Sequence, residues 1–268
     1  MQLADLAIGQ YFPGDSLLHR ADPRLKIVAL AVYAVALFFV GSLAGLLVMG
    51  AGLLLALGLA RVPARWLYRS IRPVLVLALI TFAFQLFLHG GAPLGHIGPL
   101  AVYRDGVRQG GYLAIRLLLL ALSGITLSLT TPPVLLTDAM GRLLAPLSRI
   151  GFPAYELSLM MTIALRFIPT LLSEADRVVK AQAARGAGLA GGPLARVRAL
   201  LPALVPLFIL SFRDADELAQ AMESRCWRGG RGRTLRRRLK LGPADALFAL
   251  LALALVGAGV IIGRRSGF

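Results

Sequence analysis

Side chains that could act as metal ligands or nucleophiles are few and scattered in this 268-residue sequence. Cys226 is the single cysteine, which excludes an internal disulfide framework and any multi-cysteine zinc or iron–sulfur site. The three histidines, His19, His89 and His96, do not share a metal-ligand spacing. The sequence contains no Gly-rich phosphate loop of the Walker type and no evident nucleophile–base set. We therefore expect no catalytic residues, no metal site and no cofactor in this chain.

The nearest approach to an acidic metal site is the group Asp214, Asp216 and Glu217. A membrane-embedded lipid or isoprenoid transferase would use clustered aspartates to hold a metal-bound diphosphate. The helical phase of these carboxylates favours a solvated helix face instead. A self-contained permease is a second alternative, but it would need polar side chains within several spans, where mainly Gln85 and Arg116 are found.

Two arginines occupy the same place in a repeated pattern. The segments 175–186 (ADRVVKAQAARG) and 215–226 (ADELAQAMESRC) share an initial Ala-Asp pair and an arginine near the end. Arg185 and Arg225 each continue the apolar stripe of a predicted helix at its C-terminal end. A cation there complements the helix macrodipole by about 0.3–1 kcal/mol, which would explain either arginine alone. The repeated placement favours a bidentate guanidinium contact with the carboxylates or carbonyls of a partner.

Two amphipathic helices are predicted to carry these arginines. Apolar residues recur with helical spacing while charged residues occupy the opposite face. The apolar stripes are Ile168, Leu171, Leu172, Ala175, Val178 and Val179 in the first helix, and Phe208, Phe212, Ala215, Leu218, Ala219 and Met222 in the second. Pro169 precedes the amphipathic part of the first helix, and Pro202 and Pro206 precede that of the second. Proline in a helix interior permits a kink at these points.

The elements that hold these helices are predicted to lie in a membrane. The sequence is 57% hydrophobic and only 16% charged, which is outside the usage of soluble proteins. A transmembrane helix needs about 20 mainly apolar residues. Five segments supply them: two in a helical hairpin within 25–60 that reverses around Gly41, Ser42 and Gly45, then 73–88, 111–131 and 244–262. The Pro132-Pro133 pair ends the fourth span, and a small hairpin with a turn at Asp105-Gly106 is expected before it.

The basic residues indicate an orientation. The tip of the first helical hairpin carries no Lys or Arg, whereas the segment 132–240 holds 17 of the 29 such residues. The positive-inside rule then predicts that the N-terminus and the segment 132–240 are cytoplasmic. Arg264 and Arg265 would lie on the outer side, against that rule. The net charge of +16 is thus a topology signal, and we do not expect a nucleic acid partner.

These patterns predict an all-α membrane protein with about five transmembrane helices and a cytoplasmic domain of amphipathic coupling helices. Residues 1–131 would form the N-terminal segment and spans one to four, residues 132–240 the cytoplasmic coupling-helix domain, and residues 241–268 the last span. The role of Arg116, inside the fourth span, is open between a functional intramembrane cation and an interfacial anchor.

The sequence resembles the T component of energy-coupling-factor transporters, a family that includes the cobalt-type transmembrane subunits. The resemblance covers nearly the whole chain. Three long segments carry it: 13–26 (PGDSLLHRADPRLK), 136–186 (beginning LTDAMGRLLAPLSRIGFPAYELSLMM) and 213–226 (RDADELAQAMESRC).

The resemblance implies a non-catalytic coupling subunit of an importer in a prokaryotic inner or plasma membrane. Its partners would be two ATP-binding-cassette ATPases, which bind the ATP, a substrate-binding S component and membrane lipid. The cargo would be a vitamin or a transition-metal ion such as cobalt or nickel. In the family each coupling arm ends in an arginine-centred motif, often Ala-Arg-Gly. The matching residues here are Ala184, Arg185 and Gly186 and, with both flanks changed, Ser224, Arg225 and Cys226.

Overall fold

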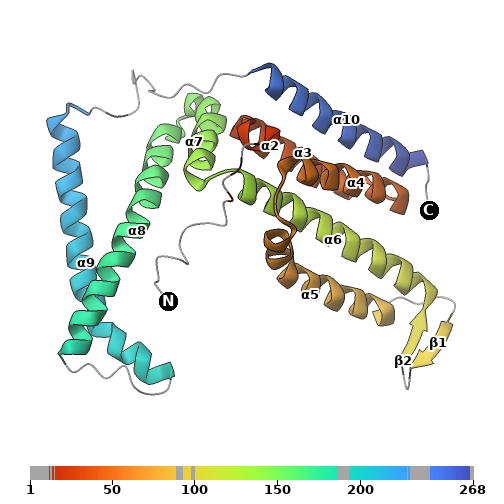
Figure 1. Ribbon diagram of the computed structural model, residues 1–268, viewed down its shortest axis with the longest axis horizontal. Helices are drawn as coiled ribbons and strands as arrows, with labels where there is room; N and C mark the ends of the chain where they lie inside the picture. Colours follow the sequence, from red (N-terminus) through yellow and green to blue (C-terminus); the bar gives the residue numbers. More distant parts are fainter. Residues whose placement is uncertain are drawn as a thin grey trace. The chain divides into compact units, whose positions relative to one another are not determined.

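The computed structural model describes residues 12, 14, 16–88, 93–97, 100–185, 193–227, 229 and 242–265. Within them the chain is helical apart from one short pair of strands, as the all-α prediction required (Figure 1). The chain divides into two compact units. The arm unit lies within Pro133–Arg238, and the core unit lies within Gln10–Pro132 and Leu239–Phe268.

The core unit contains most of the apolar helices. Its elements are α2 (Leu17–Arg20), α3 (Pro23–Phe39), α4 (Leu43–Ala60), α5 (Ala64–Leu88), the antiparallel strands β1 (Pro93–Ile97) and β2 (Leu100–Tyr103), α6 (Arg104–Thr130) and α10 (Pro243–Arg265). The arm unit contains α7 (Pro133–Leu144), the 3₁₀ helix η1 (Ala145–Ile150), α8 (Ala154–Ala184) and α9 (Pro193–Ser224).

The predicted helical hairpin is confirmed by the reversal between α3 and α4. Ser42 is the N-cap of α4, and its hydroxyl accepts a hydrogen bond from the N–H of Gly45 at 3.2 Å. Gly45 also permits close packing, since a Cβ atom there would lie 2.8 Å from the carbonyl oxygen of Gly259 in α10. Small residues at helix contacts are how membrane helices approach one another closely.

The buried core of this unit is built from α3, α4 and α6. Its fully buried members include Leu37, Leu46 and Met49, and the hydroxyl of Tyr33 donates to the carbonyl oxygen of Met49 at 3.2 Å. The opposite sides of the same helices expose large apolar side chains, among them Phe38, Phe39, Leu47, Leu54, Leu55 and Leu59. Helices that are apolar on all sides fit a lipid environment.

Five described helices are long and apolar enough to cross a membrane. Four of them coincide with predicted spans: α4, α5, α6 and α10. The fifth is α8, which the sequence analysis placed in the cytoplasmic domain. The first predicted span, α3, has 17 residues and lies at the lower limit for a crossing. The apolar half of α8 is interrupted by two charged residues, Glu156 and Arg166, before its charged half begins, and this explains why length and composition alone admit it.

Two predicted boundaries were wrong. Helix α5 begins at Ala64 rather than at Pro73, which lies inside it. Helix α6 begins at Arg104, so the Asp105-Gly106 pair lies in its first turn and not between the two paired strands, in which Ile97 pairs with Leu100. Gly106 has a packing role, because a Cβ atom there would lie 2.5 Å from the carbonyl oxygen of Gln85 in α5.

Prolines end or bend helices in both units. Helix α6 ends at Thr130 and α7 begins at Pro133, which confirms the predicted break at Pro132-Pro133. Figure 1 shows that α9, which contains Pro202 and Pro206, is bent, so that its first turns run in a different direction from the remainder. Proline is the usual cause of such bends.

Arg116 has a structural role in the core unit. Its Nη2 atom donates to the carbonyl oxygen of Val40 at 3.0 Å and to the hydroxyl of Tyr112, which itself donates to Val40. The guanidinium also lies over the rings of Tyr112 and Phe38, 4.6 and 5.5 Å from their centroids. Val40 is the C-cap of α3, where terminal carbonyls lack helical partners. The hydrogen bond and ring contacts of Arg116 therefore connect α6 to the C-terminal end of α3.

Candidate functional site at the ends of two long helices

Helix α8 shows the predicted amphipathic pattern in part. Most of the predicted apolar stripe is half-buried, namely Leu171, Leu172, Ala175, Val178 and Val179, but Ile168 is 38% exposed. On the polar side Ser173, Arg177 and Lys180 are exposed, whereas Glu174, Asp176 and Gln182 are half-buried. The stripe of this helix is thus covered in part within the chain itself.

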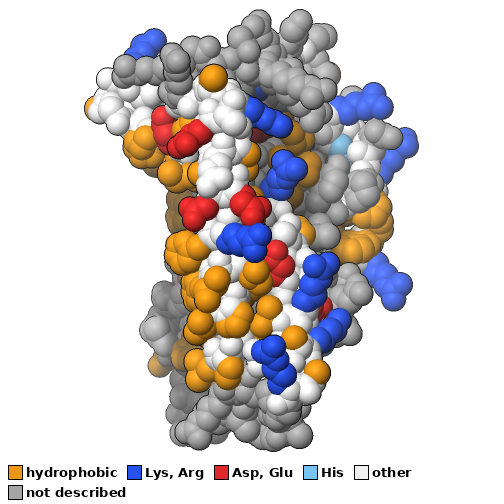
Figure 2. All heavy atoms as spheres, turned by 90° about the vertical axis from the view of Figure 1, so that its left-hand side faces the viewer, with side chains coloured by type: hydrophobic (Ala, Val, Ile, Leu, Met, Phe, Trp, Pro, Cys, Tyr) orange, Lys and Arg blue, Asp and Glu red, His pale blue; other side chains and the backbone are white. Residues whose placement is uncertain are grey.

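Helix α9 keeps much of its apolar stripe exposed. Phe208 and Phe212, both predicted stripe residues, are 61% and 69% exposed, and Val205 and Ile209 beside them are similarly exposed. Figure 2 shows hydrophobic side chains gathered on this face next to a zone of mixed acidic and basic side chains. Exposed apolar patches of this kind mark contact surfaces for a membrane or a partner protein.

Arg185 forms the C-terminal cap of α8. Its backbone N–H donates to the carbonyl oxygens of Ala181 at 3.2 Å and Gln182 at 3.1 Å. The side chains of Ala184 and Arg185 are both exposed. Gly186, the third residue of the predicted motif, lies outside the described residues.

Helix α9 ends in a Schellman motif around Arg225. The N–H of Cys226 donates to the carbonyl oxygen of Glu223 at 2.8 Å, and the N–H of Trp227 donates to that of Met222 at 3.1 Å. Cys226 has a φ of 58°, the left-handed conformation that glycine usually supplies. In the sequence repeat, Cys226 corresponds to Gly186. The left-handed backbone at the end of α9 therefore favours glycine directly after the arginine, and Cys226 occupies that position here.

Replacing Cys226 by glycine is expected to stabilise the end of α9. Glycine removes the steric cost of the left-handed conformation but adds freedom to the unfolded chain, which leaves a gain of about 0.5–1 kcal/mol. Amide hydrogen exchange at residues 226 and 227 should slow by about two- to fivefold. Ser224→Gly, in helical backbone two residues earlier, is the matched control and should speed exchange. Faster exchange in Cys226→Gly would contradict this account of the cap.

Arg185 and Arg225 are exposed and have no partner within the described residues. Neither guanidinium forms a hydrogen bond or ion pair with another described side chain, whereas Arg213 on α9 pairs with Glu217 at 3.1 Å. Ser224 and Cys226 are exposed beside Arg225, with the Ser224 hydroxyl donating to the carbonyl oxygen of Ala221 at 3.0 Å. Two cationic helix ends are thus available to an external partner.

Trp227 is a further candidate for this site, which the sequence pattern did not single out. It follows the arginine motif directly and is exposed beside Arg225. Its signal was an aromatic residue next to a predicted contact arginine, a pair that is enriched at protein interfaces. In the acidic group considered for a transferase, Glu217 is paired with Arg213. In the described part of the chain no cluster of three or more His, Cys, Asp or Glu could hold a metal ion.

Comparison with known proteins covers both units. Residues 14–235 match the family described as Cobalt transport protein. A relative from Clostridium kluyveri is 48% identical over 257 residues, 95% of each chain. One from Thermosediminibacter oceani is 43% identical over 263 residues, 98% of this chain and 99% of that relative, and one from Bacillus subtilis is 41% identical over 236 residues, 87% and 89%.

These three relatives carry the name energy-coupling factor transporter transmembrane protein EcfT. The family match includes α8, α9 and the arginines at their C-terminal ends, Arg185 and Arg225. The long apolar helices are those of a multi-pass membrane protein. Since the match also spans most of the core unit, the chain belongs to the cobalt transport protein family and is a transmembrane (T) component of an energy-coupling factor transporter.

Proposed function

We propose that this chain transmits ATP-driven motion from two ATP-binding-cassette subunits to a substrate-binding S component. Arg185 at the end of α8 and Arg225 at the end of α9 are the proposed contacts with the two ATPases. The observation that carries this proposal is the pair of exposed guanidinium groups at equivalent helix ends, without partners in the described chain. The transported substrate is a vitamin or a transition-metal ion recognised by the S component.

The physical basis is the match between guanidinium and carboxylate. A guanidinium presents a planar fork of N–H donors that binds a carboxylate through two parallel hydrogen bonds. Such a contact fixes orientation as well as distance. Helices α8 and α9 have 31 and 32 residues and are each more than about 45 Å long. A displacement of the arginine end would therefore move the surface of the whole helix.

The exposed apolar face of α9 supports an S component as the second partner. Phe208, Ile209 and Phe212 offer a hydrophobic surface on the helix that ends in Arg225. A change in the position of α9 would alter this surface directly. ATP chemistry belongs to the partner ATPases, and this chain contributes movement and binding surfaces.

The proposed location is the bacterial plasma membrane, with the N-terminus and the arm unit on the cytoplasmic side. The distribution of Lys and Arg supports this orientation, because the arm segment carries most of them. ATP is available on that side of the membrane, so the arginine-tipped ends would lie where the ATPases bind it.

Co-purification under mild detergent tests the proposal. The wild-type chain should retain two ATP-binding-cassette subunits. Each of the variants Arg185→Ala and Arg225→Ala should weaken retention, since a hydrogen bond to a charged group contributes about 1.5–3 kcal/mol. Arg177→Ala, an exposed arginine on the polar face of α8, is the matched control and should retain both subunits. Absence of any ATP-binding-cassette protein with wild type would refute the proposal, as would full retention by the double alanine variant.

A further inference from the structure

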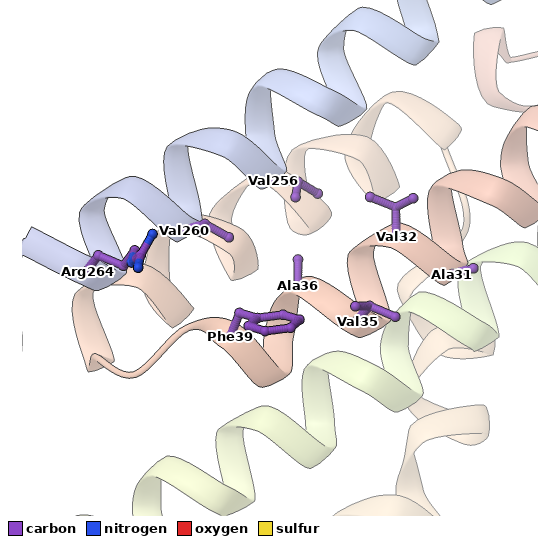
Figure 3. A pocket seen from close by; sticks show the side chains of 8 residues that line it. All are labelled: Ala31, Val32, Val35, Ala36, Phe39, Val256, Val260 and Arg264. Carbon is purple, nitrogen blue, oxygen red and sulfur yellow. The ribbon is translucent and has the colours of Figure 1, made fainter.

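A groove runs between α3 and α10 on the core unit. Its volume is about 780 Å³. It is lined by Ala31, Val32, Val35, Ala36 and Phe39 of α3 and by Val256, Val260 and Arg264 of α10. Figure 3 shows the valines of both helices along the groove and Arg264 near the end where Phe39 lies. The lining is therefore hydrocarbon closed at one end by a single guanidinium.

The groove lies along part of a helix long enough to cross a membrane. The apolar span of α10 covers Asp245–Arg264, which is 20 residues and about 30 Å, the thickness of the hydrocarbon layer. Arg264 is thus placed at the level of the lipid headgroups. From Ala31 to Phe39 helix α3 rises about 12 Å, or roughly two fifths of the hydrocarbon layer.

Among the described residues that line the groove, Arg264 alone carries a charge. It is exposed, and in the described parts of the chain no ion pair or hydrogen bond engages its guanidinium. The carboxylate of Asp245 lies at the opposite end of the same helix. Arg264 complements the dipole at the C-terminus of α10, but this does not explain an apolar groove leading to it.

A second cavity in the core unit also has a cationic side chain in its lining, but that side chain is hydrogen-bonded within the chain. This cavity of about 390 Å³ is lined mostly by apolar residues together with Lys26. The ammonium group of Lys26 donates to three oxygen atoms of the chain, those of Thr131 Oγ1, Thr130 O and His19 O. Its three N–H donors are therefore used internally, whereas the groove at Arg264 combines hydrocarbon with a cation that has no partner among the described residues.

We propose that this groove binds an anionic phospholipid, with one acyl chain between α3 and α10 and the phosphate on Arg264. The guanidinium fork matches a phosphate group geometrically, and a cation at headgroup level attracts anionic lipid. This also gives a role to a C-terminal cation that the positive-inside rule places on the unexpected side.

Native mass spectrometry of the full chain in detergent tests this site with two lipids, dioleoyl phosphatidylglycerol and dioleoyl phosphatidylcholine. Wild type should bind the anionic lipid about fivefold more tightly, the effect of one arginine near a headgroup. Arg264→Gln should remove this preference. Val35→Trp, which fills the groove from an exposed position, should weaken binding of both lipids.

Two controls match these substitutions. Arg213→Gln changes an exposed arginine of the arm unit, and Val76→Trp changes a valine that is 55% exposed on α5, close to the 57% of Val35. Neither should alter lipid binding. A preference that survives Arg264→Gln, or unchanged lipid binding by Val35→Trp, would overturn the proposal.

The same spectra distinguish other occupants. Glycerol phosphate, which carries the anion without the chains, should not displace the lipid, and displacement would indicate a free-phosphate site instead. A dimer of the chain that is lost in Val35→Trp would show that a second copy occupies the groove, and would equally overturn the lipid proposal.

Discussion

Replacing Arg185 and Arg225 together by glutamate is expected to abolish substrate uptake by the reconstituted transporter. Each wild-type arginine offers charge-assisted hydrogen bonds of about 1.5–3 kcal/mol, so losing both lowers the affinity for the ATPases by about 10²- to 10⁴-fold. Glutamate adds repulsion against acidic partner groups. Uptake of radiolabelled substrate into proteoliposomes and ATP hydrolysis by the same preparation measure the two consequences together.

The control for this result reverses two other charges. Arg177 on α8 and Arg213 on α9 are exposed and lie on the same two helices. The double variant Arg177→Glu and Arg213→Glu should retain most uptake, since exposed charges contribute little to folding. If both double variants lost uptake equally, general charge on the arms and not the two terminal arginines would be responsible. If both retained uptake, the proposed contacts would be wrong.

Lys26→Met is expected to destabilise the core unit by about 1–3 kcal/mol, the cost of leaving buried hydrogen-bond acceptors without their donor. Lys26 is only 5% exposed, although it lies near the start of an apolar span. Its Nζ atom donates to Thr131 Oγ1 at 3.1 Å and to the carbonyl oxygen of Thr130 at 3.3 Å, at the end of α6. Methionine fills a similar volume but cannot donate to these oxygens.

Two buried carboxylates complete this polar cluster. Asp245 Oδ1 accepts from the N–H of Asp22 at 2.8 Å, and Asp245 Oδ2 accepts from the N–H of Gly242 at 2.9 Å. The cluster thus joins the beginnings of α3 and α10 to the end of α6. Without Lys26, the buried carboxylates of Asp22 and Asp245 would lose a nearby positive charge.

Chemical unfolding in mild detergent measures this effect. Lys180→Met is the matched control, because Lys180 is exposed on α8 and its loss should change the free energy of unfolding by less than about 0.5 kcal/mol. A change of less than about 1 kcal/mol in Lys26→Met would show that the buried cluster does not hold the three helices together.

Features that depend on local sequence pattern could be predicted from the sequence. The membrane spans follow from apolar length, the reversal at Ser42 from small and capping residues, and the break after Thr130 from two prolines. Hydropathy could not place the start of α5, where Arg65 and Arg69 lower the apolar average within a continuous helix. It also could not decide between membrane and cytoplasm for α8, which is apolar in one half and charged in the other.

Features made by distant residues could not be predicted. Lys26 lies at the start of the first predicted span, but its oxygen partners include residues 104 and 105 positions away, at the end of α6. The packing of Gly106 against Gln85 depends on tertiary structure, so the local sequence predicts a turn there instead. The motif around Arg225 was identified, but the left-handed backbone of Cys226 became evident only from the hydrogen bonds that end α9.

The central claim is that the arginine-tipped helix ends contact the ATPases, and Cys226 allows a direct measurement. It is the only cysteine of the chain, is exposed and adjoins Arg225, so a thiol-reactive photocrosslinker can be attached there without mutation. The control variant moves the cysteine to the polar face of α8 by Cys226→Gly and Ser173→Cys. In the assembled transporter, illumination should link position 226 to an ATP-binding-cassette subunit with high yield and position 173 with much lower yield. Crosslinks from position 226 only to lipid, to the S component or within the chain itself would contradict the account.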